Sequence, residues 1–268
     1  MSLIAAVDKE KIRIWNSETF EVLHSLRGHT KGVVSMSFNI YNTKLVSGSF
    51  DKTIRIWDVI TGECLHILVG HTDCVRSVLF SPDNSLIVSG SYDGDVRIWD
   101  SETGECLNVL SNNVECFFFN PFKNTSKIKT VCFSPDNSKI ASGSDDGKIR
   151  VWNSKTGELI NTLCPYGGEC VRSVCFSPDG NRIVSCSDDD RIGIWNSNTG
   201  KYISSIFTSC IILTSVSFSQ DGSKIISTST NGYTEMWDSE TYGFLGSTFF
   251  KGCVISASLR DNLVFSFF

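Results

Sequence analysis

Short runs of hydrophobic and β-branched residues alternate with turn-forming residues along almost the whole chain. In the segment from His71 to Leu110 such runs occupy residues 75–80, 86–91, 96–99 and 106–110. The intervening residues are rich in Pro, Gly, Asn and Asp, which favour tight turns. This pattern predicts four short antiparallel strands rather than helices.

The strand pattern repeats, and six tryptophans mark the repeats. Each Trp is followed by Asp or Asn, and a Thr lies four residues after it. Successive spacings are 42, 42, 53, 43 and 42 residues, for Trp15, Trp57, Trp99, Trp152, Trp195 and Trp237. A period of about 42 residues with four strands per unit predicts a radial array of four-stranded sheets, a β-propeller. One such sheet buries both faces only by stacking on neighbours.

Two units carry a family resemblance. The segments from Gly28-His29 to Trp57-Asp58 and from Gly70-His71 to Trp99-Asp100 resemble WD40 repeats. The resemblance implies a buried hydrogen-bonded set in each blade, with a structural rather than catalytic role. One set comprises His29, Asp51 and Trp57 with Ser47 or Ser49, and the other comprises His71, Asp93 and Trp99 with Ser89 or Ser91.

Later units depart from this pattern. Gly167 or Gly168 stands where the blade of Trp195 would have its histidine, and Asn231 replaces the Asp in the blade of Trp237. We therefore expect blades four to six to be less stable than blades two and three.

The length favours six blades in a single domain, residues 1–268. Successive blades are expected at 28–69, 70–110, 111–163, 164–207 and 208–250, with an insertion near 114–127. Residues 1–27 and 251–268 would form the closing blade, with Cys253 to Leu259 as its first strand. Seven blades with incomplete terminal blades is the alternative. The apolar end, Phe265 to Phe268, either packs into the closing blade or marks a truncated seventh repeat.

Charge and cysteine content narrow the functional classes. The net charge is −5, which argues against direct nucleic-acid binding. No apolar run reaches the about 20 residues of a membrane span. The eleven cysteines include no Cys-x-x-Cys pair, and several recur at equivalent repeat positions. This favours buried apolar residues in a reducing, intracellular compartment, cytoplasmic or nuclear. The His24 and His66 positions also repeat, so we expect neither a metal nor a cofactor.

The resemblance implies that partners bind on one face, around the central channel. Residues preceding the turn Asp, and residues early in each first strand, would point there. These positions form a basic arc of Arg76, Lys129 and Arg172, flanked by two aromatic and two acidic side chains. The alternative to a binding site here is an ordinary mixed-charge surface. The candidates are Phe50, Arg76, Tyr92, Lys129, Asp145, Arg172 and Asp188.

The insertion is a second candidate. It contains Phe118, Phe119 and Phe122, an unusually apolar set for a surface loop. It would either form an extra strand or channel cap, or act as a partner-docking loop.

These features predict a non-catalytic scaffold that binds a protein or peptide, with acidic or phosphorylated residues favoured in the ligand. A substrate-recognition subunit of a larger complex, such as a ubiquitin ligase, is the first alternative. An enzyme using the channel and an RNA-associated scaffold are less favoured, because no catalytic constellation stands out from the repeats. We expect no small-molecule substrate.

Overall fold

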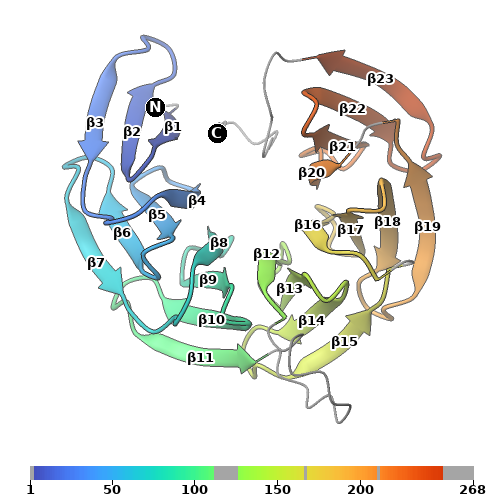
Figure 1. The fold of residues 1–268 in the computed structure, drawn as a ribbon, viewed down its shortest axis with the longest axis horizontal. Helices are drawn as coiled ribbons and strands as arrows, with labels where there is room; N and C mark the ends of the chain where they lie inside the picture. Colours follow the sequence, from blue (N-terminus) through green and yellow to red (C-terminus); the bar gives the residue numbers. More distant parts are fainter. Residues whose placement is uncertain (1–2, 112–125, 166–167, 210–211, 250–268) are drawn as a thin grey trace.

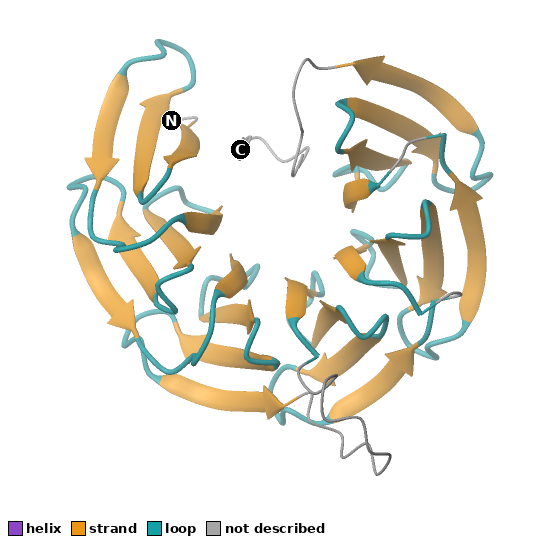
Figure 2. Cartoon of the chain, in the orientation of Figure 1, coloured by secondary structure: helices purple, strands orange, loops and turns teal. Residues whose placement is uncertain are grey.

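A computed structural model describes residues 3–111, 126–165, 168–209 and 212–249, which form six antiparallel sheets. The described residues contain strands and turns but no helix (Figure 2). Sheet 1 has three strands: β1 (Leu3–Asp8), β2 (Lys11–Asn16) and β3 (Val22–Leu26). Sheets 2 to 6 have four strands each.

Sheets 2 and 3 follow the sequence pattern closely. Sheet 2 contains β4 (Val33–Phe38), β5 (Lys44–Ser49), β6 (Ile54–Asp58) and β7 (Cys64–Leu68). Sheet 3 contains β8 (Val75–Phe80), β9 (Leu86–Ser91), β10 (Asp95–Asp100) and β11 (Cys106–Ser111). The four strands predicted between His71 and Leu110 are therefore confirmed.

The remaining sheets repeat this order. Sheet 4 contains β12 (Ile128–Phe133), β13 (Lys139–Ser144), β14 (Ile149–Asn153) and β15 (Leu159–Leu163). Sheet 5 contains β16 (Val171–Phe176), β17 (Arg182–Ser187), β18 (Arg191–Asn196) and β19 (Tyr202–Phe207). Sheet 6 contains β20 (Leu213–Phe218), β21 (Lys224–Ser229), β22 (Tyr233–Asp238) and β23 (Phe244–Phe249).

The sheets stand side by side around a central axis, as the blades of a propeller do (Figure 1). The first strand of each four-stranded sheet lies nearest the axis and the fourth forms the rim (Figure 1). In every described sheet the pairing of the last two strands shifts register at the Trp, for example between Ile56 and Trp57. Such a bulge increases local twist, which helps each rim strand follow the curve of the ring.

The core lies between the sheets. Five apolar clusters each join two consecutive sheets, and the Trp of the later sheet packs on the earlier one. Trp99, for example, packs with Ile54 and Ile56 of sheet 2. Trp15 belongs to the first sheet and is only half-buried, whereas the other five tryptophans are buried.

Sheet 1 corresponds to the second, third and fourth strands of the other sheets. Trp15 pairs with Ile4 and Val22, as Trp57 pairs with Leu45 and Cys64. The place of a first strand in sheet 1 is the one predicted for residues 253–259, which lie outside the described residues. The all-β propeller with six blades is confirmed.

Candidate functional site

Sheets 2 and 3 contain the hydrogen-bonded sets on which their turns depend. His29 Nδ1 lies 2.8 Å from Asp51 Oδ2, and His29 Nε2 lies 2.8 Å from Ser47 Oγ. Trp57 Nε1 donates to the same hydroxyl over 2.8 Å. Ser47 rather than Ser49 is therefore the shared serine. Ser49 donates instead to the backbone oxygens of Lys31 and Gly32.

Sheet 3 repeats this geometry. His71 Nδ1 lies 2.9 Å from Asp93 Oδ2, and its Nε2 lies 2.8 Å from Ser89 Oγ, which accepts from Trp99 Nε1 at 2.9 Å. Since each serine accepts the indole proton, its own hydroxyl proton is free to donate to the histidine. Each set connects the loop before the first strand of its sheet to the second and third strands of that sheet.

Burial and hydrogen bonding fix the charge of these groups. Burial lowers the pKa of His29, although Asp51 opposes this effect. Burial by itself raises the pKa of Asp51, but hydrogen bonds from Thr53, Thr30 and His29 bring it down to about 2. Burial by itself also raises the pKa of Asp93, but hydrogen bonds from His71 and from the backbone N–H groups of Asp95 and Thr72 bring it down to about 2. These groups are held in place and serve structure.

In sheet 4 an arginine replaces the missing histidine. Arg150 Nη2 donates to Asp146 Oδ2 over 2.7 Å, and the residue is only 3% exposed. Trp152 Nε1 still donates to Ser142 Oγ at 3.0 Å. This ion pair of Arg150 with Asp146 is not predicted by the sequence pattern.

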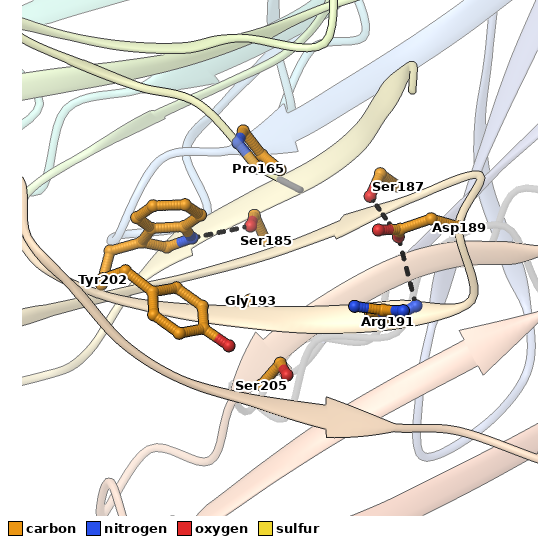
Figure 3. Close-up of a pocket in the computed structure, with 9 residues that line it drawn as sticks. Pro165, Ser185, Ser187, Asp189, Arg191, Gly193, Tyr202 and Ser205 are labelled. Atoms are coloured by element: carbon orange, nitrogen blue, oxygen red, sulfur yellow. Dashed lines mark hydrogen bonds between the residues drawn. The ribbon is translucent and has the colours of Figure 1, made fainter. Parts of the chain in front are cut away.

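Sheet 5 has neither a histidine nor an arginine at these places, since Gly193 takes the arginine position. Trp195 Nε1 donates to Ser185 Oγ at 3.0 Å, and Asp189 accepts from Ser187 Oγ at 2.6 Å (Figure 3). The hollow beside Trp195 has room for about one water molecule, so it is too small to bind a peptide or a cofactor.

The turns that join second to third strands lie beside the segments that precede first strands. Backbone bonds show this: Tyr92 N donates to Cys74 O at 2.9 Å, and Asp145 N donates to Lys127 O at 3.0 Å. Asp188 N makes the same bond to Cys170 O at 3.2 Å. The candidate residues of sheets 3, 4 and 5 are thereby brought to one face of the ring.

Two lysines of sheet 4 approach one tyrosine ring of sheet 3. Lys129 Nζ lies 4.3 Å and Lys127 Nζ 5.3 Å from the centre of the Tyr92 ring. Among the described residues, no carboxylate lies within ion-pair distance of either ammonium group. Lys127 was not among the predicted candidates, although it occupies the repeat position of Cys74 and Cys170. We call Tyr92, Lys127 and Lys129 the lysine–tyrosine group.

The predicted basic arc is uneven. Arg172 is held by Asp188 through two bonds, Nε to Oδ1 at 2.7 Å and Nη2 to Oδ2 at 3.1 Å. Its positive charge is therefore already balanced, which the sequence pattern did not reveal. Among the described residues Arg76 donates one hydrogen bond, from Nη1 to Val34 O at 3.3 Å. Burial raises the pKa of Asp145, against the nearby charges of Lys129 and Lys127.

The other candidates lie apart from this group. Phe50 is 43% exposed in sheet 2 and makes no ring contact or cation–π contact with the group among the described residues. Phe118, Phe119 and Phe122 lie outside the described residues. Within the described ranges no group of three or more His, Cys, Asp or Glu residues is arranged to hold a metal ion. Nor does any helix there have the length and hydrophobicity needed to cross a membrane.

A known family matches the chain with the same repeat period. The sequence profile of the WD domain, G-beta repeat, matches residues 20–58, 62–100, 104–153, 157–196 and 200–238. These segments make up most of the chain, which therefore belongs to the WD40 family. Repeats of this family generally mediate protein–protein interactions as scaffolds, and its propellers are generally non-catalytic. A search of the curated proteins found no match.

The matched segments are offset from the sheets. The segment 20–58 contains the rim strand β3 of sheet 1 and the first three strands of sheet 2. Every matched repeat therefore spans two sheets. The polypeptide chain of each repeat connects the same two sheets that an apolar cluster holds together.

Proposed function

We propose that the chain is an intracellular, non-catalytic interaction module that binds a peptide segment of a partner protein. The peptide would lie across the face that carries the lysine–tyrosine group, and its ligand group would be an acidic or phosphorylated side chain. The observation that supports this most directly is the approach of two ammonium groups to one half-buried ring, with neither group ion-paired within the described part of the chain.

Physical chemistry favours an anion at this place. Two cations that share one ring repel each other, and an anion between them relieves that repulsion. Arg76 lies early in β8, on the sheet that carries Tyr92, and the guanidinium donors that have no partner among the described residues suit the oxygens of a carboxylate or a phosphate. The Arg172–Asp188 pair would border the site rather than bind the anion.

Degenerate peptide libraries with one fixed central residue test the proposal. Libraries with fixed phosphoserine, Glu, Ala or Lys would be compared by binding to the immobilised protein. We expect the anionic libraries to bind and the Ala and Lys libraries not to. The phosphoserine and Glu arms show which anion is preferred.

The matched control uses lysines of the opposite turns. Lys127→Ala with Lys129→Ala should weaken binding at least tenfold, whereas Lys155→Ala with Lys201→Ala, which removes the same charge, should leave binding unchanged. Equal loss in both variants would mean that only net charge matters, and it would contradict a specific site.

A further inference from the structure

Sheet 2 differs from the other four-stranded sheets at the end of its strands opposite to the lysine–tyrosine group. In the turn between its first and second strands it has Ile40-Tyr41, where the other sheets have Pro-Asp or Gln-Asp. In the turn between its third and fourth strands it has Ile60. The residues at that position in sheets 3 to 6 are Glu102, Lys155, Asn198 and Glu240.

The first of these turns is stabilised in a way that leaves Ile40 and Tyr41 unused. In sheet 3 the turn depends on Asp83, whose Oδ1 accepts from Ser81 Oγ at 2.6 Å and from Ser85 N at 3.0 Å. In sheet 2 Asn39 takes over this task, and its Oδ1 accepts from Thr43 N at 2.8 Å and Lys44 N at 3.0 Å. The side chains at 40 and 41 are therefore not needed for the turn.

The three apolar side chains are well exposed and lie on connected turns. Ile40 is 65%, Tyr41 75% and Ile60 74% exposed. Val59 N donates to Thr43 O over 2.9 Å, which joins the two turns that carry them. Single exposed apolar residues are common, but three at one edge of one sheet, at positions that are polar elsewhere, are not explained by folding.

Acidic residues surround this edge. The turns at 39–43, 59–63, 81–85 and 101–105 contain Glu63, Asp83, Glu102 and Glu105 but no Lys or Arg. Ile40 N donates to Asn84 Oδ1 at 2.9 Å, so the turn of Asp83 is in contact with the edge. Lys44 beside this edge is already paired with Glu102 at 2.7 Å, and the ring of His24 lies 3.0 Å from the backbone oxygen of Ile60.

We propose that Ile40, Tyr41 and Ile60 form a second docking surface, for a partner segment that presents apolar side chains flanked by Lys or Arg. Apolar contact would provide the binding energy, and the acidic surroundings would select a basic segment. The same charges oppose two other occupants. A second copy would bring an acidic rim against an acidic rim, and an anionic lipid surface would be repelled.

The probe is a twelve-residue amphipathic peptide of alternating Leu and Lys pairs, with a twin in which Glu replaces Lys. Binding is followed by the methyl NMR signals of Ile40 and Ile60 in the full chain. We expect the Lys peptide to shift both signals and the Glu twin to shift neither. Binding that leaves both methyl signals unchanged, or equal binding of the twin, would overturn the proposal.

The variants take their residues from the neighbouring sheets. Tyr41→Asp with Ile60→Glu, the residues of sheet 3, should weaken the Lys peptide at least tenfold. Asn198→Glu, at the position of Ile60 in sheet 5, should leave it unchanged. Ile60→Glu alone replaces the double variant if urea unfolding shows that the latter is not folded. An equal loss of affinity for the Lys peptide in the Asn198 variant would mean that only net charge matters, and it would contradict the proposed surface.

Two further measurements separate the other occupants. Sedimentation of the chain at rising concentration, and pelleting with phosphatidylserine vesicles, are compared for the original chain and the double variant. We expect a monomer and no pelleting in both cases. A dimer or vesicle binding that the double variant abolishes would assign the surface to a second copy or to a membrane instead.

Discussion

At the scale of single residues, the tryptophan of each of sheets 2 to 5 donates its indole N–H to a serine hydroxyl of the same sheet. Sheet 6 is different, because Trp237 Nε1 and Ser227 Oγ are buried and have no hydrogen-bond partner among the described residues. These two serines offer a matched comparison. Ser89→Ala should cost about 1–3 kcal/mol of unfolding free energy, since it removes the partner of Trp99 Nε1 and of His71 Nε2. Ser227→Ala should cost clearly less, and equal losses in urea unfolding would contradict this account.

The lowered pKa values of Asp51 and Asp93 predict a pH dependence of stability. A carboxyl whose pKa is lower in the folded state stabilises the fold above its unfolded pKa, and this contribution is lost as the pH falls from about 4 to about 2. Each group contributes about 2 kcal/mol at neutral pH. The lowered pKa of His29 acts in the same direction, because protonation of the unfolded chain below pH 6.5 favours unfolding.

Urea unfolding between pH 7 and pH 3 measures both effects. We expect stability to fall throughout this range, and Asp51→Asn with Asp93→Asn to lower stability at pH 7 and flatten its decline below pH 4. Glu105→Gln, an exposed turn residue, should change neither. A double variant with an unchanged acid slope would contradict the assignment.

At the scale of elements, the sheets differ in how well their buried polar groups are paired. Arg150 provides a partner for Asp146 in sheet 4, whereas in sheet 6 Trp237, Ser227 and Glu235 each have a buried polar atom with no partner in the described ranges. Hydrogen exchange should therefore be slowest in β5 and β9, intermediate in β13 and fastest in β21. Protection of β21 equal to that of β9 would count against the ordering.

The arginine itself is testable. Arg150→Ala leaves a half-buried carboxylate without its cation, so we expect a loss of about 3 kcal/mol and faster exchange in β14. Arg13→Ala is the control, because its pair with Asp8 is about half exposed and contributes little. A similar loss for the two variants would show that Arg150 contributes only packing.

Strands and turns were predictable because their signals are local. The alternation of runs and turns placed the strands of sheet 3 within a residue or two, and the spacing of Trp57 and Trp99 gave the repeat. The Arg150–Asp146 and Arg172–Asp188 pairs were not predictable, since they depend on which way a long side chain turns after folding. Lys127 was missed because the sequence pattern places it in the insertion near 114–127, where the repeat spacing is broken.

At the scale of the whole molecule, five apolar clusters join six sheets in a row, and Trp15 lacks a preceding sheet among the described residues. The sequence predicts that residues 253–259 add the missing first strand to sheet 1. Val254 takes the repeat position of Val75, which is fully buried in sheet 3. Val254→Asp should then destabilise β1 and expose Trp15 to acrylamide quenching.

Val264→Asp is the control for that prediction, because the run from Leu263 to Phe268 resembles a second strand, and β1 already takes the second-strand place in sheet 1. If Val264→Asp destabilises β1 as much as Val254→Asp does, or if neither variant affects β1, closure by residues 253–259 is wrong.

The central claim is that the lysine–tyrosine group captures an anionic peptide. Its most direct test is the affinity of the best peptide from the phosphoserine or Glu library, measured by calorimetry for the original chain and both lysine pairs. We predict at least a tenfold loss with Lys127→Ala plus Lys129→Ala and no change with Lys155→Ala plus Lys201→Ala. An unchanged affinity in the first variant would contradict the claim.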